Sequence, residues 1–380
     1  MICQMLSTIL QKSKNHTMKN QMNNLLVTGA AGFIGSNFVK FMNDKYPEIK
    51  IISLDKLTYA GNKANLSEMA ECKNHLFVQG DILDKSLVLS LLREYEIDTL
   101  VHFAAESHVD NSIDNPQIFL ETNVIGTFTL LEAARIYWLN ERQWDKSKCR
   151  FHHVSTDEVY GSLEREEPAF TEKNSYQPNS PYSASKASSD HIVRAYYHTY
   201  GLPVTTSNCS NNYGPNQHKE KLIPKVVYAC VNQLPITVYG NGSNIRDWLY
   251  VMDHCEAIDT IIQKGALGEV YNIGGNNELD NLSLIKMICQ MMDDLKPMEK
   301  PYHSLITFVE DRKGHDKRYA IDNSKIQKEL GWVPQGDFVH KLSNTIEHYL
   351  KKYIRAKSYF ALNLPNQEFT SKFIRPHSLF

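Results

Sequence analysis

Residues 25–35 read Leu-Leu-Val-Thr-Gly-Ala-Ala-Gly-Phe-Ile-Gly, a short apolar run that ends at three spaced glycines. A strand, a glycine loop and a helix in this order are typical of the start of a nucleotide-binding α/β fold. Gly29, Gly32 and Gly35 permit a tight turn and a close backbone approach, and the helix N-terminus attracts a pyrophosphate. The spacing is Gly-x-x-Gly-x-x-Gly rather than the commoner Gly-x-Gly-x-x-Gly.

Similar apolar runs recur along the first half of the chain, at Ile51–Asp55, Leu76–Gln79, Thr99–Phe103, Phe151–Ser155 and Pro203–Ser207. They alternate with helical patterns at Asp84–Tyr95, Pro116–Tyr137 and Pro181–Tyr200. The last of these has Ser180 as a candidate N-cap and Pro181 at its first position. Near-continuous apolar strands separated by helices predict an α/β fold with a Rossmann-type, doubly wound parallel sheet.

The alternation ends after Asn208, where Gly, Asn and Pro cluster at residues 211–216 and 240–242. Further helices are expected at Leu282–Met292 and Asn323–Leu330. We therefore expect residues 24–208 to form the nucleotide-binding domain. Residues 209–355 are expected to form mainly a smaller α/β substrate-binding lobe, with some segments returning to the first domain. Residues 1–23 are read as a disordered extension and 356–380 as a tail.

Composition excludes several classes of protein. The formal net charge of −2 offers no basic surface, so no nucleic acid partner is expected. No apolar run is long enough to span a membrane and no signal peptide is evident, so we expect a cytoplasmic protein. The seven cysteines include no Cys-x-x-Cys pair. They indicate free thiols in a reducing compartment and no metal site.

An acidic residue at the end of the second strand indicates which dinucleotide binds. Asp55 lies 20 residues past Gly35, where a carboxylate can bind the ribose diol and repel a 2′-phosphate. This favours NAD over NADP, although Lys56 beside it weakens the preference. Asp81, after the third strand, is either an adenine contact or a helix-cap or turn residue. Ala104 and Ala105 either let a cofactor lie against the backbone or serve packing.

Two further stretches carry acid–base chemistry, Ser-Thr-Asp-Glu-Val-Tyr-Gly at 155–161 and Tyr-Ser-Ala-Ser-Lys at 182–186. Tyr182 and Lys186 lie four apart on one helix face, where the ammonium is expected to make the phenol a base near neutral pH. Asp157 and Glu158 offer a second acid–base pair, which a simple alcohol oxidation does not need. The combination predicts oxidation coupled to elimination.

The Asp157–Glu158 pair can share a site only under one condition. Neighbours on a strand point to opposite faces, so the chain must have left the strand by Asp157. The plain alternative is that the two acids cap a helix while Thr156 pairs in the sheet.

Six longer strings point to a family, namely Asp55–Asn62, Ala104–Asp110, Ser155–Gly161, Asn208–Pro215, Arg246–Val251 and Asp311–Asp316. Together with the glycine loop and the Tyr182/Lys186 pair, they resemble the extended short-chain dehydrogenase/reductase superfamily. Within it, the chain is similar to the dTDP-glucose 4,6-dehydratase family from about Leu25 to Leu350. The loop departs from the commoner Gly-Gly-Ala-Gly, and Lys313 stands where the family usually has Pro.

The resemblance implies roles for individual positions. NAD would be held by the glycine loop and by Phe33, Ile34, Asp55, Lys56, Leu57, Thr58, Asp81, Ile82, Ala104, Ala105 and Thr122, with Asn212 near the nicotinamide. Tyr182 would remove the sugar 4-hydroxyl proton, with Lys186 on the nicotinamide ribose and Thr156 bonded to that hydroxyl. Glu158 would take the C5 proton, and Asp157 would protonate the leaving C6 hydroxyl. The nucleotide-sugar would contact Ser107, Asn211, Lys221, Arg246, Asn281 and His315.

The implied reaction converts dTDP-glucose to dTDP-4-keto-6-deoxyglucose by C4 oxidation, loss of water between C5 and C6, and hydride return to C6. Oxidation comes first because a C4 ketone acidifies the C5 proton. Asp157 must then be protonated near pH 7, so burial and Glu158 should raise its pKa. The resemblance also implies a homodimer formed through Pro116–Tyr137 and Pro181–Tyr200.

Three alternatives stay in view. UDP-glucose 4-epimerases and UDP-glucuronate decarboxylases share the Tyr/Lys pair and NAD but lack the Asp157–Glu158 pair. A 4,6-dehydratase acting on UDP-glucose or another nucleotide-sugar stays open, because spacing does not reveal a thymine contact. A non-catalytic NAD-sensing protein is disfavoured because every expected catalytic group is present. Arg318 is either a diphosphate contact or a surface residue, and His108, His152 and His153 are read as structural.

Overall fold

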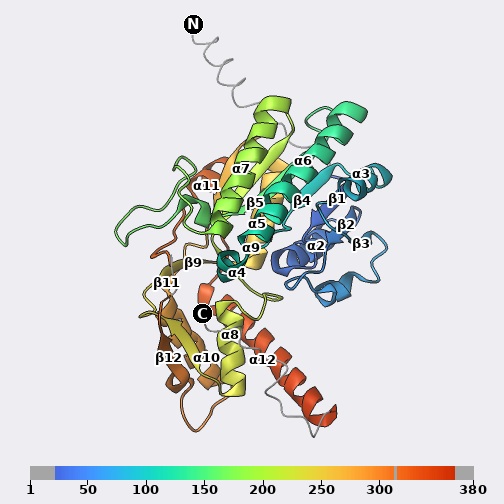
Figure 1. The fold of residues 1–380 in the computed structure, drawn as a ribbon. Coiled ribbons are helices and arrows are strands. Elements are labelled where there is room, and N and C mark those ends of the chain that lie inside the picture. The colour runs from blue at the N-terminus through green and yellow to red at the C-terminus, as the bar shows by residue number, and fades with distance from the viewer. Residues whose placement is uncertain (1–21, 312–314, 364–380) are drawn as a thin grey trace, which may run out of the picture.

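The computed structural model describes residues 22–311 and 315–363. A seven-stranded parallel sheet lies at its centre, with strand order β10-β6-β5-β4-β1-β2-β3 (Figure 1). The strands are β1 (Asn24–Thr28), β2 (Lys50–Asp55), β3 (His75–Gln79), β4 (Thr99–His102), β5 (Arg150–Thr156), β6 (Val204–Cys209) and β10 (Val270–Ile273). The predicted Rossmann-type sheet is confirmed. Its seventh strand, β10, comes from the second half of the chain and was not predicted.

Helices cover both faces of the sheet, because alternate strand residues point to opposite sides. In β1, Leu25 and Val27 join one buried core and Leu26 joins the other. The first core includes α2 (Phe33–Lys45), α9 (Val251–Lys264) and α11 (Ser324–Leu330). The second includes α3 (Lys85–Glu94), α6 (Thr127–Ala134) and α7 (Pro181–Tyr200).

The helix expected at Pro116–Tyr137 is a composite of four segments. It consists of α5 (Pro116–Phe119), the π-helix η2 (Leu120–Gly126), α6 and the π-helix η3 (Arg135–Glu141). Short helices on the same half are η1 (Lys63–Met69), α4 (Val109–Asp114) and η4 (Asp157–Tyr160). The wider π turns change which side chains face the core along this stretch.

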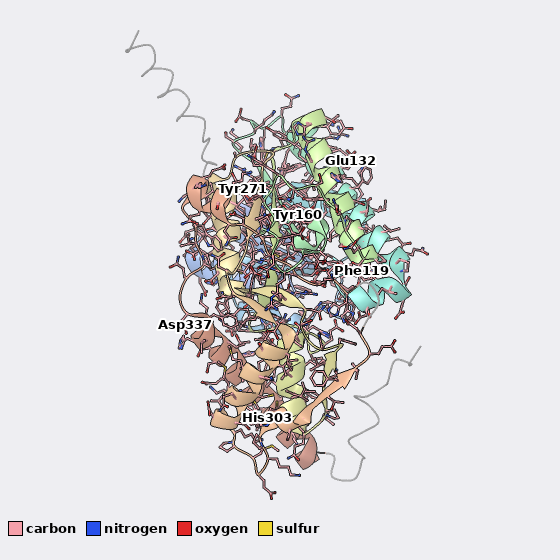
Figure 2. All side chains as sticks on the ribbon, turned by 90° about the vertical axis from the view of Figure 1, so that its left-hand side faces the viewer. Phe119, Glu132, Tyr160, Tyr271, His303 and Asp337 are labelled. Atoms are coloured by element: carbon pink, nitrogen blue, oxygen red, sulfur yellow. The ribbon has the colours of Figure 1, made fainter. Side chains whose placement is uncertain are left out.

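A smaller lobe lies below the sheet in the view of Figure 1. Its helices are α8 (Leu222–Asn232), α10 (Asn281–Leu295), η5 (Tyr302–Leu305) and α12 (Phe338–Asn363). Its strands are β7 (Asn211–Tyr213), β9 (Ile245–Tyr250) and β11 (Glu278–Asp280) in one sheet, and β8 (Ile236–Tyr239) and β12 (Ile306–Val309) in another. The lobe has its own apolar core. Figure 2 shows the two halves through their labelled side chains, Tyr160 and Tyr271 in the sheet half and His303 in the smaller lobe.

The domain boundaries differ in detail from those expected. β10 and α9 belong to the sheet half although they follow residue 209, and α12 continues through Ala356 to Asn363, which corrects the start of the expected tail. The rest of that tail and residues 1–21 of the expected extension lie outside the described residues. Within the described ranges, no helix is long and apolar enough to cross a membrane. Six cysteines there are free, and no cluster of metal-binding side chains is found.

Candidate active site

A cleft of about 320 Å³ opens at the carboxyl ends of the parallel strands, where ligands bind in folds of this type. Segments that follow β1 to β6 line it. It brings together most of the predicted site residues, namely Gly29, Gly32, Phe33, Ile34, Gly35, Asp55, Lys56, Thr58, Asp81, Ile82, Ala104, Ala105, Ser107, Thr122, Thr156, Asp157, Glu158, Tyr182, Lys186, Asn211, Asn212 and Lys221. Four predicted residues do not line it, namely Leu57, Arg246, Asn281 and His315.

The glycine loop is tightly packed against its surroundings. Gly29 has φ +68°, and a Cβ there would lie 2.6 Å from the Ala104 nitrogen. A Cβ on Gly35 would lie 2.2 Å from the Gly29 oxygen. Helix α2 then starts at Phe33 without a side-chain cap, so its first amides stay available to an anion. The loop thus fits the pyrophosphate of a dinucleotide.

The Asp55 carboxylate is held rigidly at the end of β2. One oxygen accepts a hydrogen bond from the Ala31 amide at 2.9 Å and the other accepts from the Leu57 amide at 2.7 Å. Burial raises the pKa of Asp55, and these two bonds oppose the rise. Each carboxylate oxygen has a second lone pair, which fits the two hydroxyls of a ribose. Leu57 contributes through its backbone, which adopts φ 58°.

Lys56 and Asp81 form an ion pair, with 2.7 Å between the ammonium and the carboxylate. Asp81 also accepts a hydrogen bond from the Leu83 amide, whereas Asp84 caps α3. Asp81 is therefore a turn residue that also lines the cleft, and the adenine contact stays a prediction. The pairing balances the Lys56 charge, which would otherwise attract a 2′-phosphate. This arrangement favours NAD.

The chain leaves strand β5 at the point that the acid–base pair requires. β5 ends at Thr156, and the 3₁₀ helix η4 begins at Asp157. The Thr156 hydroxyl accepts a hydrogen bond from the Glu158 amide at 3.3 Å and thereby caps the turn. Because the strand alternation stops here, Asp157 and Glu158 line the same cleft.

Asp157 is set up as a neutral acid. It is 2% exposed, and burial, Glu158 and Asp247 raise its pKa well above the usual range, while Arg246 opposes the rise. One carboxyl oxygen bonds the Thr156 hydroxyl at 3.3 Å. The other is buried and has no hydrogen-bond partner among the described residues. A protonated carboxyl with an unused oxygen can donate its proton to a bound ligand. The pKa direction is the one predicted, with the predicted causes.

Tyr182 differs from expectation in its electrostatics. Helix α7 starts with a capping box between Ser180 and Ser183, which places Tyr182 in the first turn beside Thr156. Burial and the Glu158 carboxylate raise the Tyr182 pKa well above its ordinary value. The Lys186 ammonium donates to the Val154 carbonyl at 2.8 Å. The Tyr182 pKa is therefore shifted in the direction opposite to the expected one, because burial is the largest cause of the shift.

Basic residues reach toward the cleft from the smaller lobe. Lys221 donates to the Ser107 carbonyl at 3.2 Å, which links α8 to the segment after β4. Arg246 is 5% exposed and donates to the carbonyls of Ile245 and Asp316, at 2.7 and 3.0 Å. It lies outside the cleft lining, yet its charge acts on Asp157.

The remaining predicted residues have structural partners. The Asn212 side-chain oxygen lies 2.9 Å from a His254 ring nitrogen, and His315 lies 2.7 Å from Asp311. Asn281 is the first residue of α10.

The residues that were left open or read as structural also have partners in the fold. Arg318 binds Glu278 through two hydrogen bonds, at 2.6 and 2.9 Å, which accounts for it without a ligand. His152 lies between the hydroxyls of Thr205 and Ser207.

Two buried acids near the cleft were not predicted. Glu106 lines the cleft, and burial raises its pKa. Asp190 lies one helical turn after Lys186, and burial raises its pKa to about 6. Glu106 stands inside the family string at 104–110, and Asp190 follows Lys186 at the same spacing by which Lys186 follows Tyr182. Both positions were therefore visible in the sequence.

Comparison with known proteins gives a consistent result. The family described as GDP-mannose 4,6 dehydratase matches residues 26–345. A dTDP-glucose 4,6-dehydratase of Xanthomonas campestris is 53% identical over 327 residues, which is 86% of this chain and 92% of the relative. One from Escherichia coli is 48% identical over 334 residues, with the same two coverages of 86% and 92%.

Solved structures agree. A dTDP-glucose 4,6-dehydratase from Bacillus anthracis in complex with NAD is 45% identical with a TM-score of 0.77, covering 87% of this chain and 97% of that one. One from Streptomyces venezuelae with NAD and TYD bound is 45% identical with a TM-score of 0.78, covering 86% and 97%. A UDP-glucose 4-epimerase from Thermotoga maritima with UDP-glucose is 27% identical with a TM-score of 0.75, covering 87% and 99%.

Proposed function

The chain belongs to the dTDP-glucose 4,6-dehydratase family of extended short-chain dehydrogenases/reductases, and we propose that it converts dTDP-glucose to dTDP-4-keto-6-deoxyglucose. The observation that carries the proposal is the Asp157–Glu158 pair beside Tyr182, with Asp157 buried and its pKa raised by that burial and by Glu158. An epimerase or a simple dehydrogenase has no use for a neutral acid next to a second carboxylate.

NAD is the cofactor. The loop at Gly29–Gly35 would hold its pyrophosphate, Asp55 its adenosine ribose, and Lys186 and Asn212 its nicotinamide end. When bound, NAD would supply a hydride acceptor for C4 of the sugar and, once reduced, a hydride donor for C6, so no external reductant would be consumed. The chain's own residues supply the proton transfers and the binding.

We assign the removal of the C4 hydroxyl proton to Tyr182, with Thr156 beside it. Their hydroxyls are hydrogen-bonded in this structure, so one sugar hydroxyl can meet both. Because burial and Glu158 hold the phenol protonated, positive charge beside it must lower its pKa for the base to form. Lys186, buried on the same helix face, contributes part of that charge.

We assign the elimination of water to the two adjacent acids, Asp157 and Glu158. Glu158 takes the C5 proton, which the neighbouring C4 ketone has made acidic. Asp157 gives its proton to the leaving C6 hydroxyl, for which a neutral acid is needed. The roles are opposite although the residues are neighbours. The difference in environment separates them, because Asp157 is buried whereas Glu158 is only partly so.

The nucleotide-sugar would be held by Ser107 of the sheet half, by Asn211 and Lys221 at the cleft, and by Arg246, Asn281 and His315 beyond it. Lys221 and Arg246 offer charge to a diphosphate, and Arg offers a planar fork of donors. Residues 24–208, with β10 and α9, would then bind the cofactor. The free cysteines fit a reducing, cytoplasmic setting.

The function is tested by supplying dTDP-glucose and UDP-glucose separately to the NAD-loaded enzyme. We expect dTDP-glucose to give a 4-keto-6-deoxy sugar, seen by its absorbance in alkali, and C4-deuterated substrate to give product labelled at C6. Faster turnover of UDP-glucose would favour the alternative, a 4,6-dehydratase of another nucleotide-sugar. Epimerised product without dehydration would refute the assignment to dehydratases.

We also propose that the protein is a homodimer. Large apolar side chains are exposed on the helices that precede and include α6 and on α7, namely Ile113, Ile118, Leu120, Ile125, Phe128 and Tyr200, each 37–52% exposed. The helices that carry these side chains contact one another, and exposed apolar side chains gathered on neighbouring helices are typical of a protein interface. A second copy of the same helices can cover these side chains through a two-fold axis.

Light scattering should therefore give about twice the chain mass of 43.6 kDa. The double variant Leu120→Asp/Phe128→Asp should give the monomer mass, because buried charges would destabilise the interface. Phe308→Asp is the matched control, since Phe308 is 55% exposed but lies on β12 in the smaller lobe. A wild-type protein of 43.6 kDa in dilute solution would contradict the dimer.

A further inference from the structure

A buried carboxylate lies on the same helix as the catalytic lysine, one turn further along the chain. Asp190 follows Lys186 by one turn of α7, so the two side chains share a helix face. Both are almost fully buried, with 6% and 4% exposure. None of the proton transfers proposed above uses Asp190. Among the described residues, the His153 ring lies at ion-pair distance from Asp190, and no lysine or arginine does. A buried acid of this kind needs an explanation.

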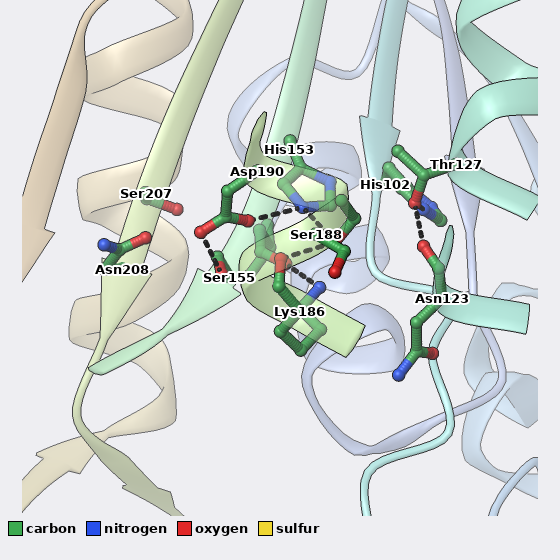
Figure 3. Close-up of polar contacts among 12 residues, drawn as sticks. His102, Asn123, Thr127, His153, Ser155, Lys186, Ser188, Asp190, Ser207 and Asn208 are labelled. Atoms are coloured by element: carbon green, nitrogen blue, oxygen red, sulfur yellow. Dashed lines mark hydrogen bonds and ion pairs between the residues drawn. The ribbon is translucent and has the colours of Figure 1, made fainter. Parts of the chain in front are cut away.

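Asp190 is held in place by neutral donors. One carboxylate oxygen lies 3.1 Å from His153 Nε2 and the other accepts from the Ser155 hydroxyl at 2.8 Å (Figure 3). Burial and the Lys186 ammonium lower the pKa of His153 well below its usual value, which favours the uncharged ring. The Tyr176 hydroxyl also bonds Asp190. These contacts orient the carboxylate but do not balance its charge.

Lys186 supplies the balancing charge. The titratable groups around Asp190 are Lys186, His191 on α7, and the phenols of Tyr160 and Tyr176. Of these, Lys186 stabilises the carboxylate most. The effect is reciprocal, since burial lowers the Lys186 pKa and Asp190 is the first group that opposes the fall. The ammonium has three N–H donors, and one of them bonds the Val154 carbonyl. The other two are available to a ligand in the cleft.

We propose that Asp190 is a positioning residue for the reaction, whose carboxylate keeps Lys186 charged and directed into the cleft, while Ser155 and His153 hold that carboxylate in place. The proposal rests on the proposed function only in the role given to Lys186. It explains why a polar cluster is buried under the cofactor end of the cleft, where apolar packing would stabilise the fold equally well.

The direct test uses the NAD-loaded protein, with lysine labelled at Cε for NMR and the Lys186 signal assigned from Lys186→Met. Asp190→Asn keeps the size and hydrogen-bonding capacity of the side chain but removes the charge. The Lys186 titration should shift to lower pH by about one unit or more, because an opposite charge nearby has been lost. An unchanged titration would overturn the proposal.

A matched control is Asp259→Asn. Asp259 is 1% exposed and binds Lys45 at 2.7 Å, but it lies on α9, on the opposite face of the sheet. Its loss should leave the Lys186 titration and the turnover unchanged. In Asp190→Asn, by contrast, the alkaline limb of kcat should move to lower pH in step with Lys186. KM for dTDP-glucose should change little, because Asp190 does not line the cleft.

A wild-type measurement covers the case in which Asp190→Asn does not fold. Burial raises the pKa of Asp190 to about 6, so protonation of Asp190 should perturb the Lys186 Cε signal as the pH falls through that value. A Lys186 Cε signal that does not change as the pH passes through about 6 would count against the proposal. If Lys186 and Asp190 behave as expected but dTDP-glucose is not dehydrated, the proposed function fails and this coupling stands.

Discussion

Replacing Tyr182 with Phe should lower the turnover of dTDP-glucose by about 10²- to 10⁴-fold, because we propose the phenol as the base that removes the C4 hydroxyl proton. Such a loss corresponds to about 3 to 5 kcal/mol of transition-state stabilisation. Turnover is measured under saturating substrate, so that the change appears in kcat. Near wild-type turnover would show that another group is the base.

The fold should tolerate this substitution. Phe keeps the ring that packs edge-on against Phe119, with 6.3 Å between centroids, and removes only the hydroxyl. Tyr271→Phe is a matched control, because that hydroxyl bonds Glu329 at the far edge of the sheet and does not line the cleft. Its turnover should stay close to wild type. Equal losses in both variants would mean that stability, not catalysis, had been measured.

The sheet could be predicted because its signals are local. Each of the six predicted strands is a short apolar or β-branched run, and the residues that follow the strands meet at one edge whatever the rest of the chain does. β10 could not be predicted in this way. Its four residues, Val270–Ile273, become a strand only because β6 offers them an edge. That pairing joins segments more than sixty residues apart.

The site shows the same division. The raised pKa of Asp157 was predictable, since burial and an adjacent carboxylate act in the same direction. For Tyr182, burial raises the pKa whereas the Lys186 ammonium was expected to lower it, and sequence spacing gives no measure of burial. Only the fold shows that burial has the largest effect on the Tyr182 pKa and that the Lys186 ammonium donates a hydrogen bond to the Val154 carbonyl. Spacing therefore identified groups that the fold brings into one cleft, but not the balance of electrostatic effects on them.

Replacing Asp157 with Asn should stop elimination while leaving C4 oxidation largely intact. The amide cannot give a proton to the leaving C6 hydroxyl, yet the Tyr182 hydroxyl and its Thr156 partner remain. The 4-keto sugar should then accumulate before water is lost. Rapid mixing of NAD-loaded enzyme with dTDP-glucose should show this as a lasting absorbance of reduced nicotinamide, with product formed about 10²- to 10⁴-fold more slowly.

Exchange at C5 separates the acid from the base. In Asp157→Asn, Glu158 still removes the C5 proton from the ketone, so hydrogen at C5 should exchange with deuterated solvent although no water leaves. In Glu158→Gln, that exchange should be lost as well, while oxidation again survives. The two neighbouring carboxyls thus give different signatures on the same substrate. If oxidation and elimination slow equally in Asp157→Asn, or if C5 exchange disappears with them, Asp157 is not the dedicated acid, and the raised pKa of its buried carboxyl has another purpose.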